Sequence, residues 1–313
     1  MRQKKEGRTL RLKLRDLEML QALAEAGSMA AAAEQLALSQ PAISKAMSEM
    51  EYGLGAQLLD RSSRGVVLTE SGRVLLQHGR VILDEVRLGI TEIEHLSDPA
   101  QGEVRIGTGD PAAVVVSEII SALSRRYPRI TYQIQVAEPT TLMRGLRERK
   151  LDVLVTRWVA TGDDDDMKAE ILYESPLAVM ADHRHRLLRR KTISLPDLLT
   201  EPWIHWPPDS LLGRSVKAVF AKNKLTLPLA TVTTGSINMR LNLLATGRFL
   251  SILPVTMLRH PSNRAWLRAL PVDLGDETGS AACITLKKRR PAGAVKLFVE
   301  ESRAVCKTAF WAA

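Results

Sequence analysis

The sequence predicts a protein of mixed class, α followed by α/β, built from three consecutive parts. Short apolar helices separated by Gly and Ser predict a small helical domain over residues 1–70. One long amphipathic stretch predicts an extended helix over residues 71–97. Alternating strand and helix patterns predict an α/β region over residues 98–313, whose length suits two lobes of about 100 residues each.

The composition is that of an ordinary globular protein, with 45% hydrophobic and 25% charged residues among 313. No run of about 18 apolar residues is present, so no membrane span is expected. The basic N-terminus has no apolar core of a secretory signal, which favours a cytoplasmic location. The two cysteines, Cys283 and Cys306, lack metal-ligand spacing, so we expect neither a metal site nor a cofactor.

The formal net charge of +9 suggests a polyanionic partner, but the charge is unevenly distributed. Bases dominate residues 1–15, whereas acids outnumber Lys and Arg over residues 16–97. A nucleic-acid contact in this region would therefore depend on individually placed cations. Two later basic runs, 183–186 and 287–290, are expected to be solvated surfaces. The four aspartates at 163–166 are expected to form a solvated loop, with metal binding as the second choice.

Three short helices are predicted in the N-terminal domain. Residues 16–26 place apolar side chains on one face, and Gly27 ends that helix. Ser28 can cap a second, Ala-rich helix over residues 29–36. Ser39 can cap a third helix with Pro41 in its first turn, where the missing N–H costs little.

The third helix carries two different faces. Ile43 and Met47 should face the core, whereas Gln40, Ser44 and Lys45 fall on the other side. Two short helices joined by a tight turn, the second with such polar residues near its N-terminus, are typical of a helix-turn-helix. Gln and Lys can reach base edges, and Ser can reach bases or phosphates. An ordinary helical hairpin with a polar outer face is the alternative.

Residues 54–72 predict a short hairpin that follows this helix. Its tip carries two Arg and two Ser, which can lie along phosphates or in a minor groove. The resulting hypothesis is a contact with double-stranded DNA through eight residues: Ser28, Ser39, Gln40, Pro41, Ser44, Lys45, Arg61 and Arg64.

The segment from Ser28 to Gly72 resembles the winged helix-turn-helix of LysR-type transcriptional regulators. The matching pieces include Gly27-Ser28, Ala31-Ala32-Ala33, Leu38-Ser39-Gln40-Pro41-Ala42-Ile43-Ser44, Leu58-Leu59-Asp60-Arg61 and Leu68-Thr69-Glu70-Ser71-Gly72. Leu59 departs from the pattern, since an aromatic residue is usual there. The resemblance implies a dimer or tetramer that binds promoter DNA and engages RNA polymerase in response to a small effector.

The long helix carries an apolar seam with heptad spacing. The seam consists of Leu75, Ile82, Val86, Ile93 and Leu96. A solitary helix would expose this seam, so pairing with a second copy of the chain is expected. The resemblance implies that this linker helix dimerises the DNA-binding domain, and residues 97–102 are expected to serve as the hinge after it.

The remaining chain is interpreted as a parallel α/β region. Strands are predicted at 104–106, 130–136, 153–156, 177–180, 203–205, 231–233, 249–253 and 282–286, and helices at 114–126, 141–149, 236–245 and 293–310. The resemblance implies an effector domain similar to periplasmic binding proteins. Lobe I would span about 102–162 and 276–313 and lobe II about 163–275, with crossovers near 162–175 and 270–280.

Ligands of open α/β sheets bind beyond the C-terminal ends of strands, near helix N-termini. Residues at such strand ends are predicted to line the effector site: Thr108, Gly109, Asp110, Thr140, Thr156, Arg157, His205, Thr234 and Ser236. Arg157 would pair with a carboxylate or phosphate, or with Asp110 instead. His205 lies between Trp203 and Trp206, a pattern that suits sugars, although placement in the core or at the surface is favoured for this histidine. A small anionic or sugar-like effector is therefore expected.

Two other functional classes are considered. A solute-binding protein of a transport system fits the α/β region, but not the first 97 residues. An enzyme is disfavoured, because Gly-x-Ser-x-Gly, a phosphate-binding loop, a complete Gly-x-Gly-x-x-Gly and His-Glu-x-x-His are missing from the sequence. No catalytic or metal-binding residue is assigned.

Overall fold

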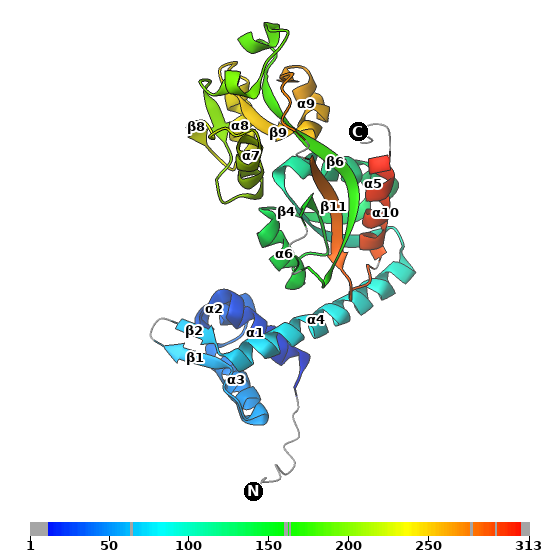
Figure 1. Cartoon of the computed structure of the whole chain (residues 1–313). Coiled ribbons are helices and arrows are strands. Elements are labelled where there is room, and N and C mark those ends of the chain that lie inside the picture. Colours follow the sequence, from blue (N-terminus) through cyan, green and yellow to red (C-terminus); the bar gives the residue numbers. More distant parts are fainter. Residues whose placement is uncertain are drawn as a thin grey trace. The chain divides into compact units, whose positions relative to one another are not determined.

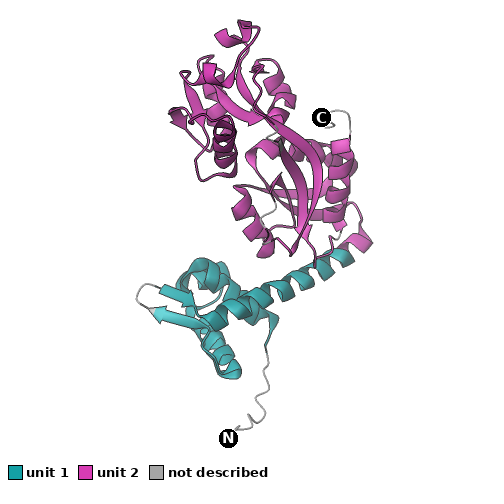
Figure 2. Cartoon of the chain, in the orientation of Figure 1, with its two compact units in different colours: residues 1–93 teal, residues 94–313 magenta. Residues whose placement is uncertain are grey.

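The computed structural model describes residues 12–62, 65–159, 162, 164–275, 278–291 and 293–307. The chain forms two compact units, residues 1–93 and 94–313, shown in different colours in Figure 2. The boundary falls near the end of the long helix α4 (Glu70–Ser97). Within the described ranges, no helix is long and apolar enough to cross a membrane.

The first unit contains three helices and a hairpin before α4 (Figure 1). Its elements are α1 (Leu14–Ala26), α2 (Met29–Gln35), α3 (Gln40–Leu54), β1 (Leu59–Ser62) and β2 (Gly65–Leu68). Ser28 and Ser39 cap α2 and α3 by accepting hydrogen bonds from Ala31 N (3.2 Å) and Ala42 N (3.4 Å). The predicted order of helices, turn and hairpin is confirmed.

Apolar side chains from all three helices and the hairpin form the core of the first unit. Leu20, Ile43, Met47 and Leu58 are almost completely buried there. The apolar face of α3 is thus covered by the protein itself, which leaves its opposite face to solvent.

The second unit alternates strands and helices. Its strands are β3 (Gln101–Thr108), β4 (Arg129–Val136), β5 (Val153–Trp158), β6 (Met167–Asp182), β7 (Trp203–His205), β8 (Ala230–Thr233), β9 (Ser251–Pro254), β10 (Leu267–Ala269) and β11 (Thr278–Leu286). Its α-helices are α5 (Ala113–Arg126), α6 (Pro139–Arg147), α7 (Leu211–Lys222), α8 (Ile237–Leu244), α9 (Pro261–Arg264) and α10 (Gly293–Lys307). Neither α7 nor β10 was predicted from the sequence.

The main sheet is mixed, so the expectation of a parallel sheet is wrong. Its strand order is β10-β6-β11-β5-β3-β4, with β9 also paired to β6. Only β3, β4 and β5 run parallel, whereas β11 is antiparallel to both β5 and β6. The sheet is mixed because β6 runs into lobe II and β11 runs back out of it. These neighbouring strands are therefore antiparallel.

The long strand β6 belongs to both lobes, as its curved course in Figure 1 shows. Its first part, to Pro176, pairs with β11, and its second part, from Leu177, pairs with β9 and β10. Lobe I contains β3–β5, α5, α6 and α10, and lobe II contains β7–β10 and α7–α9. Separate apolar cores, around Ile106 and Phe298 and around Trp203 and Phe220, stabilise the two lobes.

A buried ionic network lies within lobe I. The fully buried carboxylate of Asp152 accepts hydrogen bonds from Arg105 Nη2 at 2.8 Å and Arg289 Nη2 at 2.6 Å. The interpretation of residues 287–290 as a solvated surface is therefore wrong for Arg289, because its guanidinium pairs with the buried carboxylate of Asp152. His185 in the other basic run is also buried, and burial lowers its pKa.

Candidate DNA interface and effector pocket

The polar face of α3 is open to solvent. Gln40, Pro41 and Lys45 are exposed and Ser44 is half-buried, whereas Ile43 on the opposite face is completely buried. Lys45 makes a loose 3.9 Å contact with Glu49, and its side chain is 79% exposed. We call Gln40, Pro41, Ser44 and Lys45 the recognition face, since a partner molecule can contact these side chains while the domain stays folded.

Glu51 fixes the hairpin against α3, a role that was not predicted from the sequence. Its Oε1 accepts hydrogen bonds from the backbone N of Leu58 (2.8 Å) and Leu59 (3.1 Å) at the start of β1. Its Oε2 lies 3.9 Å from Nη2 of Arg61, whose Nη1 donates to Ser44 Oγ at 3.2 Å. A wing cation is thereby held beside the recognition face.

The other strand of the hairpin is fixed to the turn between α1 and α2. Val66 N donates to Gly27 O at 3.0 Å. Gly65 beside it has a φ of +120°, and a Cβ added there would lie 2.8 Å from the same carbonyl oxygen. The hairpin therefore joins both ends of the helix-turn-helix. Arg64, also predicted to contact DNA, lies outside the described residues.

Replacing Glu51 with alanine is expected to destabilise the first unit by about 1–3 kcal/mol, because two backbone N–H groups lose their acceptor. Thermal unfolding followed by helical circular dichroism would measure the loss. Glu49→Ala on the same helix is the matched control and should change stability by less than about 0.5 kcal/mol, since its pair with Lys45 is exposed. Equal effects of the two substitutions would contradict the role given to Glu51.

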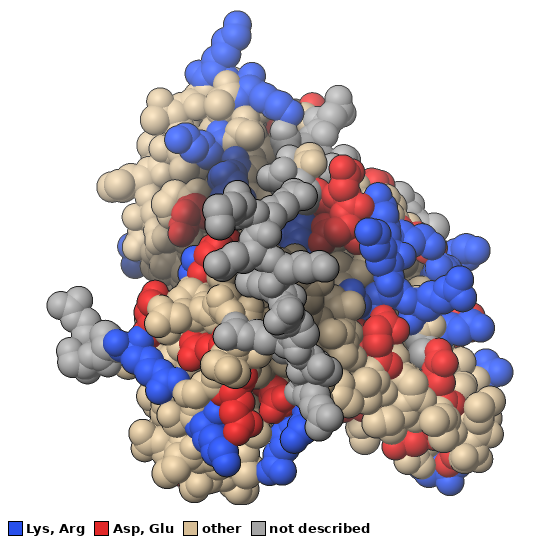
Figure 3. All heavy atoms as spheres, turned by 90° about the horizontal axis from the view of Figure 1, so that it is seen from below, with Lys and Arg blue, Asp and Glu red and all other residues tan. Residues whose placement is uncertain are grey.

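The surface charges are mixed. Figure 3 shows Asp and Glu side chains among the Lys and Arg side chains on the face that it presents. That DNA contacts depend on individually placed cations such as Lys45 and Arg61 stays a prediction.

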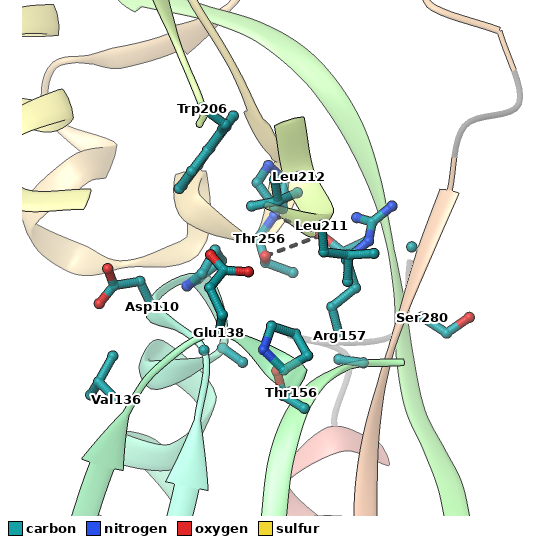
Figure 4. Close-up of a pocket in the computed structure, with 18 of the residues that line it drawn as sticks. Asp110, Val136, Glu138, Thr156, Arg157, Trp206, Leu211, Leu212, Thr256 and Ser280 are labelled. Carbon is teal, nitrogen blue, oxygen red and sulfur yellow. Dashed lines mark hydrogen bonds between the residues drawn. The ribbon is translucent and has the colours of Figure 1, made fainter. Parts of the chain in front are cut away.

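A cavity of about 280 Å³ lies between the lobes of the second unit (Figure 4). Lobe I contributes segments that follow its strands: 109–112 after β3, 136–139 after β4, and 156–157 at the end of β5. Lobe II contributes Trp206, Leu211, Leu212 and Thr256. The strands that cross between the lobes complete the wall with Tyr173 and Ser175 of β6 and residues 279–281 of β11.

Four of the nine predicted effector residues line this cavity: Gly109, Asp110, Thr156 and Arg157. Thr108 does not, because its completely buried hydroxyl donates to Val155 O at 2.8 Å. Thr140 is exposed in the first turn of α6 and lies outside the lining, although its neighbour Pro139 is part of it.

The three lobe II residues of that prediction also have structural roles. His205 stacks on Trp203, its Nε2 lies 3.0 Å from Pro228 O, and burial lowers its pKa. Ser236 caps α8 by accepting from Met239 N, and Thr234 Oγ1 accepts from Ser236 N. Only Gly235 between them reaches the cavity. His205, Thr234 and Ser236 therefore do not belong to the lining of this cavity, and their polar atoms bind within the fold. Their part in effector binding stays a prediction.

The position of the Arg157 side chain depends on Gly279 of the neighbouring strand β11. Arg157 pairs with Ala281 in the sheet, and its guanidinium lies over Gly279, where an added Cβ would overlap Cζ. Among the described residues no ion pair joins it to Asp110, whose side chain lies on the opposite side of the cavity in Figure 4. The salt bridge considered as the alternative role for Arg157 is not formed.

Arg240 supports the lobe II wall and was not predicted. Its guanidinium carbon lies 3.8 Å from the ring centroid of Trp206, and the completely buried side chain donates to the carbonyl oxygens of Ile204, His205 and Thr234. Burial lowers the pKa of Arg240 to about 9. Trp206 Nε1 donates to Ile252 O at 2.9 Å. The indole is therefore fixed before any ligand enters.

The cavity wall is mainly apolar, with polar groups at a few positions. Leu211, Leu212, Trp206 and Val136 supply apolar surface, and the hydroxyl groups of Ser175 and Thr256 pair at 3.1 Å across the lobes. The first residues of α6 and α7 also face the cavity, so the positive ends of two helix dipoles point toward it. Such a cleft suits a small organic molecule with at least one charged group.

Comparison with protein families assigns both units. Residues 14–73 match the model described as "Bacterial regulatory helix-turn-helix protein, lysR family", and residues 97–307 match "LysR substrate binding domain". The chain belongs to the LysR family. It is accordingly a DNA-binding transcriptional regulator, and the transport alternative is not supported.

Individual relatives agree with this assignment. The chain is 31% identical to the HTH-type transcriptional regulator GbpR of Rhizobium radiobacter over 72% of this chain and 76% of the relative. It is 28% identical to the uncharacterized HTH-type transcriptional regulator YnfL of Escherichia coli K12, over 84% and 88% respectively. Both are named as regulators of transcription.

Solved structures share the fold. A full-length OxyR variant from Pseudomonas aeruginosa is similar with a TM-score of 0.71 and 17% identity, covering 96% of this chain and 97% of that one. CbnR, a LysR family regulator, is similar with a TM-score of 0.54 and 23% identity, covering 93% and 100%. CbnR has also been solved in complex with its target DNA.

Proposed function

We propose that this LysR-family regulator binds promoter DNA through the recognition face of α3 and responds to a small effector in the inter-lobe cavity. The exposed recognition face, placed beside Arg61 and opposite a fully buried apolar face, carries the DNA part of this proposal. Gln40 and Lys45 would reach base edges in the major groove, and Arg61 would contact the backbone or minor groove. Arg64 belongs to the same proposal through its sequence position.

The working form proposed here is a dimer or tetramer. Along α4 the side chains of Ile82, Val86, Ile93 and Leu96 are 40–84% exposed, which is costly for an isolated helix and favourable for a paired one. Two recognition faces brought together in this way would read an interrupted inverted repeat. RNA polymerase at the adjacent promoter would be the downstream partner, in the cytoplasm where the DNA lies.

The cavity is proposed as the effector site, with no catalytic step and no further cofactor. Gly109, Asp110, Thr156 and Arg157 would contact the effector from lobe I, and Trp206 and Thr256 from lobe II. The apolar walls do not favour the sugar-like effector considered above, since sugars need many polar partners. A charged molecule with an apolar body fits the lining better.

Lys45→Ala is expected to weaken binding to the specific operator by about tenfold or more, and binding to random DNA much less. A gel-shift titration of both DNAs at one salt concentration measures this difference. The matched control is Lys13→Ala, an exposed cation just before α1. An equal loss on both DNAs would show that Lys45 contacts phosphate only.

Footprinting upstream of the chain's own gene, with and without a metabolite panel, tests the proposal as a whole. A protected site that changes with one compound is the expected result. A footprint that no substitution on the recognition face alters would overturn the proposed interface.

A further inference from the structure

The charged groups that line the inter-lobe cavity are unequal in sign. Two carboxylates, Asp110 and Glu138, and one guanidinium, Arg157, belong to the lining. In Figure 4 the two acids lie on one side of the cavity and Arg157 on the other. The Arg157 side suits an anionic group, but this side accounts for only one of the three charges.

Both acids lie at the start of a helical segment, where a negative charge is favourable, but neither side chain is held by a hydrogen bond or ion pair within the described residues. Glu138 stands at the N-cap position of α6, yet its side chain makes no capping hydrogen bond. Asp110 begins the 3-10 turn Asp110–Ala112 ahead of α5, and within the described residues neither carboxylate forms an ion pair or a side-chain hydrogen bond. Their charges therefore remain available to a molecule that enters the cavity.

A purely anionic effector would be a poor occupant of this cavity. Its binding would displace water from two carboxylates without giving them a partner, and like charges would repel across a partly apolar space. A cationic group on the effector removes both penalties, because an ammonium ion donates to carboxylates directly.

We infer that the effector carries an ammonium group bound by Asp110 and Glu138, a carboxylate bound by Arg157, and an apolar body against Trp206 and Leu212. An amino carboxylate with an apolar side chain is the ligand class that has all three features. The cavity volume of about 280 Å³ limits it to a molecule of modest size. This inference rests on the proposed effector role of the cavity.

Calorimetric titration of the full-length protein with matched probes tests the inference. One set is L-phenylalanine, 3-phenylpropanoate and 2-phenylethylamine, and a second is L-leucine, 4-methylpentanoate and 3-methylbutylamine. In at least one set the amino carboxylate should bind about tenfold tighter than both analogues, because each analogue lacks one of the two charged groups that the lining would bind. Equal or tighter binding of the carboxylates, or no binding of either amino acid, would overturn the inference.

The Glu138→Gln variant tests whether Glu138 binds the ammonium group. It should weaken the amino carboxylate about tenfold and leave the deaminated probe nearly unchanged or tighter. Glu118→Gln on the exposed surface of α5 is the matched control and should change neither. An unchanged preference in Glu138→Gln would also overturn the inference. Operator binding, measured in parallel by gel shift, tests the DNA part of the proposed function separately, since it does not require the ligand class to be right.

Discussion

Replacing Asp152 with alanine is expected to lower the unfolding free energy of the second unit by about 3–5 kcal/mol, the largest loss among the substitutions considered. The substitution removes a carboxylate that pairs with two arginines, Arg105 and Arg289. Arg289 is 6% exposed and cannot regain water without opening the structure. Its charge would remain buried without the carboxylate that balances it.

Tryptophan fluorescence during urea unfolding would measure this loss in the relevant unit, because all five tryptophans lie at residue 158 or later. Asp166→Ala provides the matched control. Asp166 also accepts two hydrogen bonds from an arginine, Arg147, but the Asp166 side chain is 47% exposed. The control should lose about 1 kcal/mol or less, and a similar loss for both variants would contradict the importance of burial.

Replacing Gly279 with alanine is expected to abolish most of the ligand response while leaving the fold intact. The added Cβ would overlap the guanidinium of Arg157, which lies at the end of a flexible side chain and can move away at little cost. Arg157 would then leave its position in the cavity. Affinity for the effector should fall by about tenfold or more, as in Arg157→Ala.

Thr285→Ala is the control for this prediction. Thr285 lies on the same strand, β11, and does not belong to the cavity lining. Ligand titration and thermal unfolding of the three variants would separate the effects. A large drop in melting temperature for Gly279→Ala, with ligand affinity preserved, would contradict the role given to this glycine.

The first unit was predictable from sequence because its signals are local. Ser28 and Ser39 cap helices within three residues of themselves, and Gly27 ends a helix at its own position. The alternation of Ile43 and Met47 with Gln40 and Ser44 defines both faces of α3 without reference to the rest of the chain. Glu51 was missed because its partners at 58 and 59 come from a turn whose geometry no short pattern specifies.

The cavity was only partly predictable, because some of its residues come together through contacts between distant segments. Strand ends of lobe I located Gly109, Asp110, Thr156 and Arg157, since the parallel strands there follow the expected arrangement. Gly279 and Trp206 reach the cavity through pairings between distant segments, as in the contact of β11 with β5. The predicted polar residues at the lobe II strand ends lie outside the cavity lining, because a His or Thr that binds a ligand and one that binds the backbone give the same sequence pattern.

The continuous course of β6 has a mechanical consequence. Ladder hydrogen bonds tie the strand to β11 up to Pro176 and to β9 from Leu177 onward, so neither lobe can slide along it. A ligand that draws the lobes together must therefore bend or twist the strand near Pro176, whose ring fixes φ and which has no N–H to lose. The lobes would then open and close by elastic bending of a continuous sheet, not by rotation about a flexible linker. The stiffness of the sheet would set the force that returns them to the starting position.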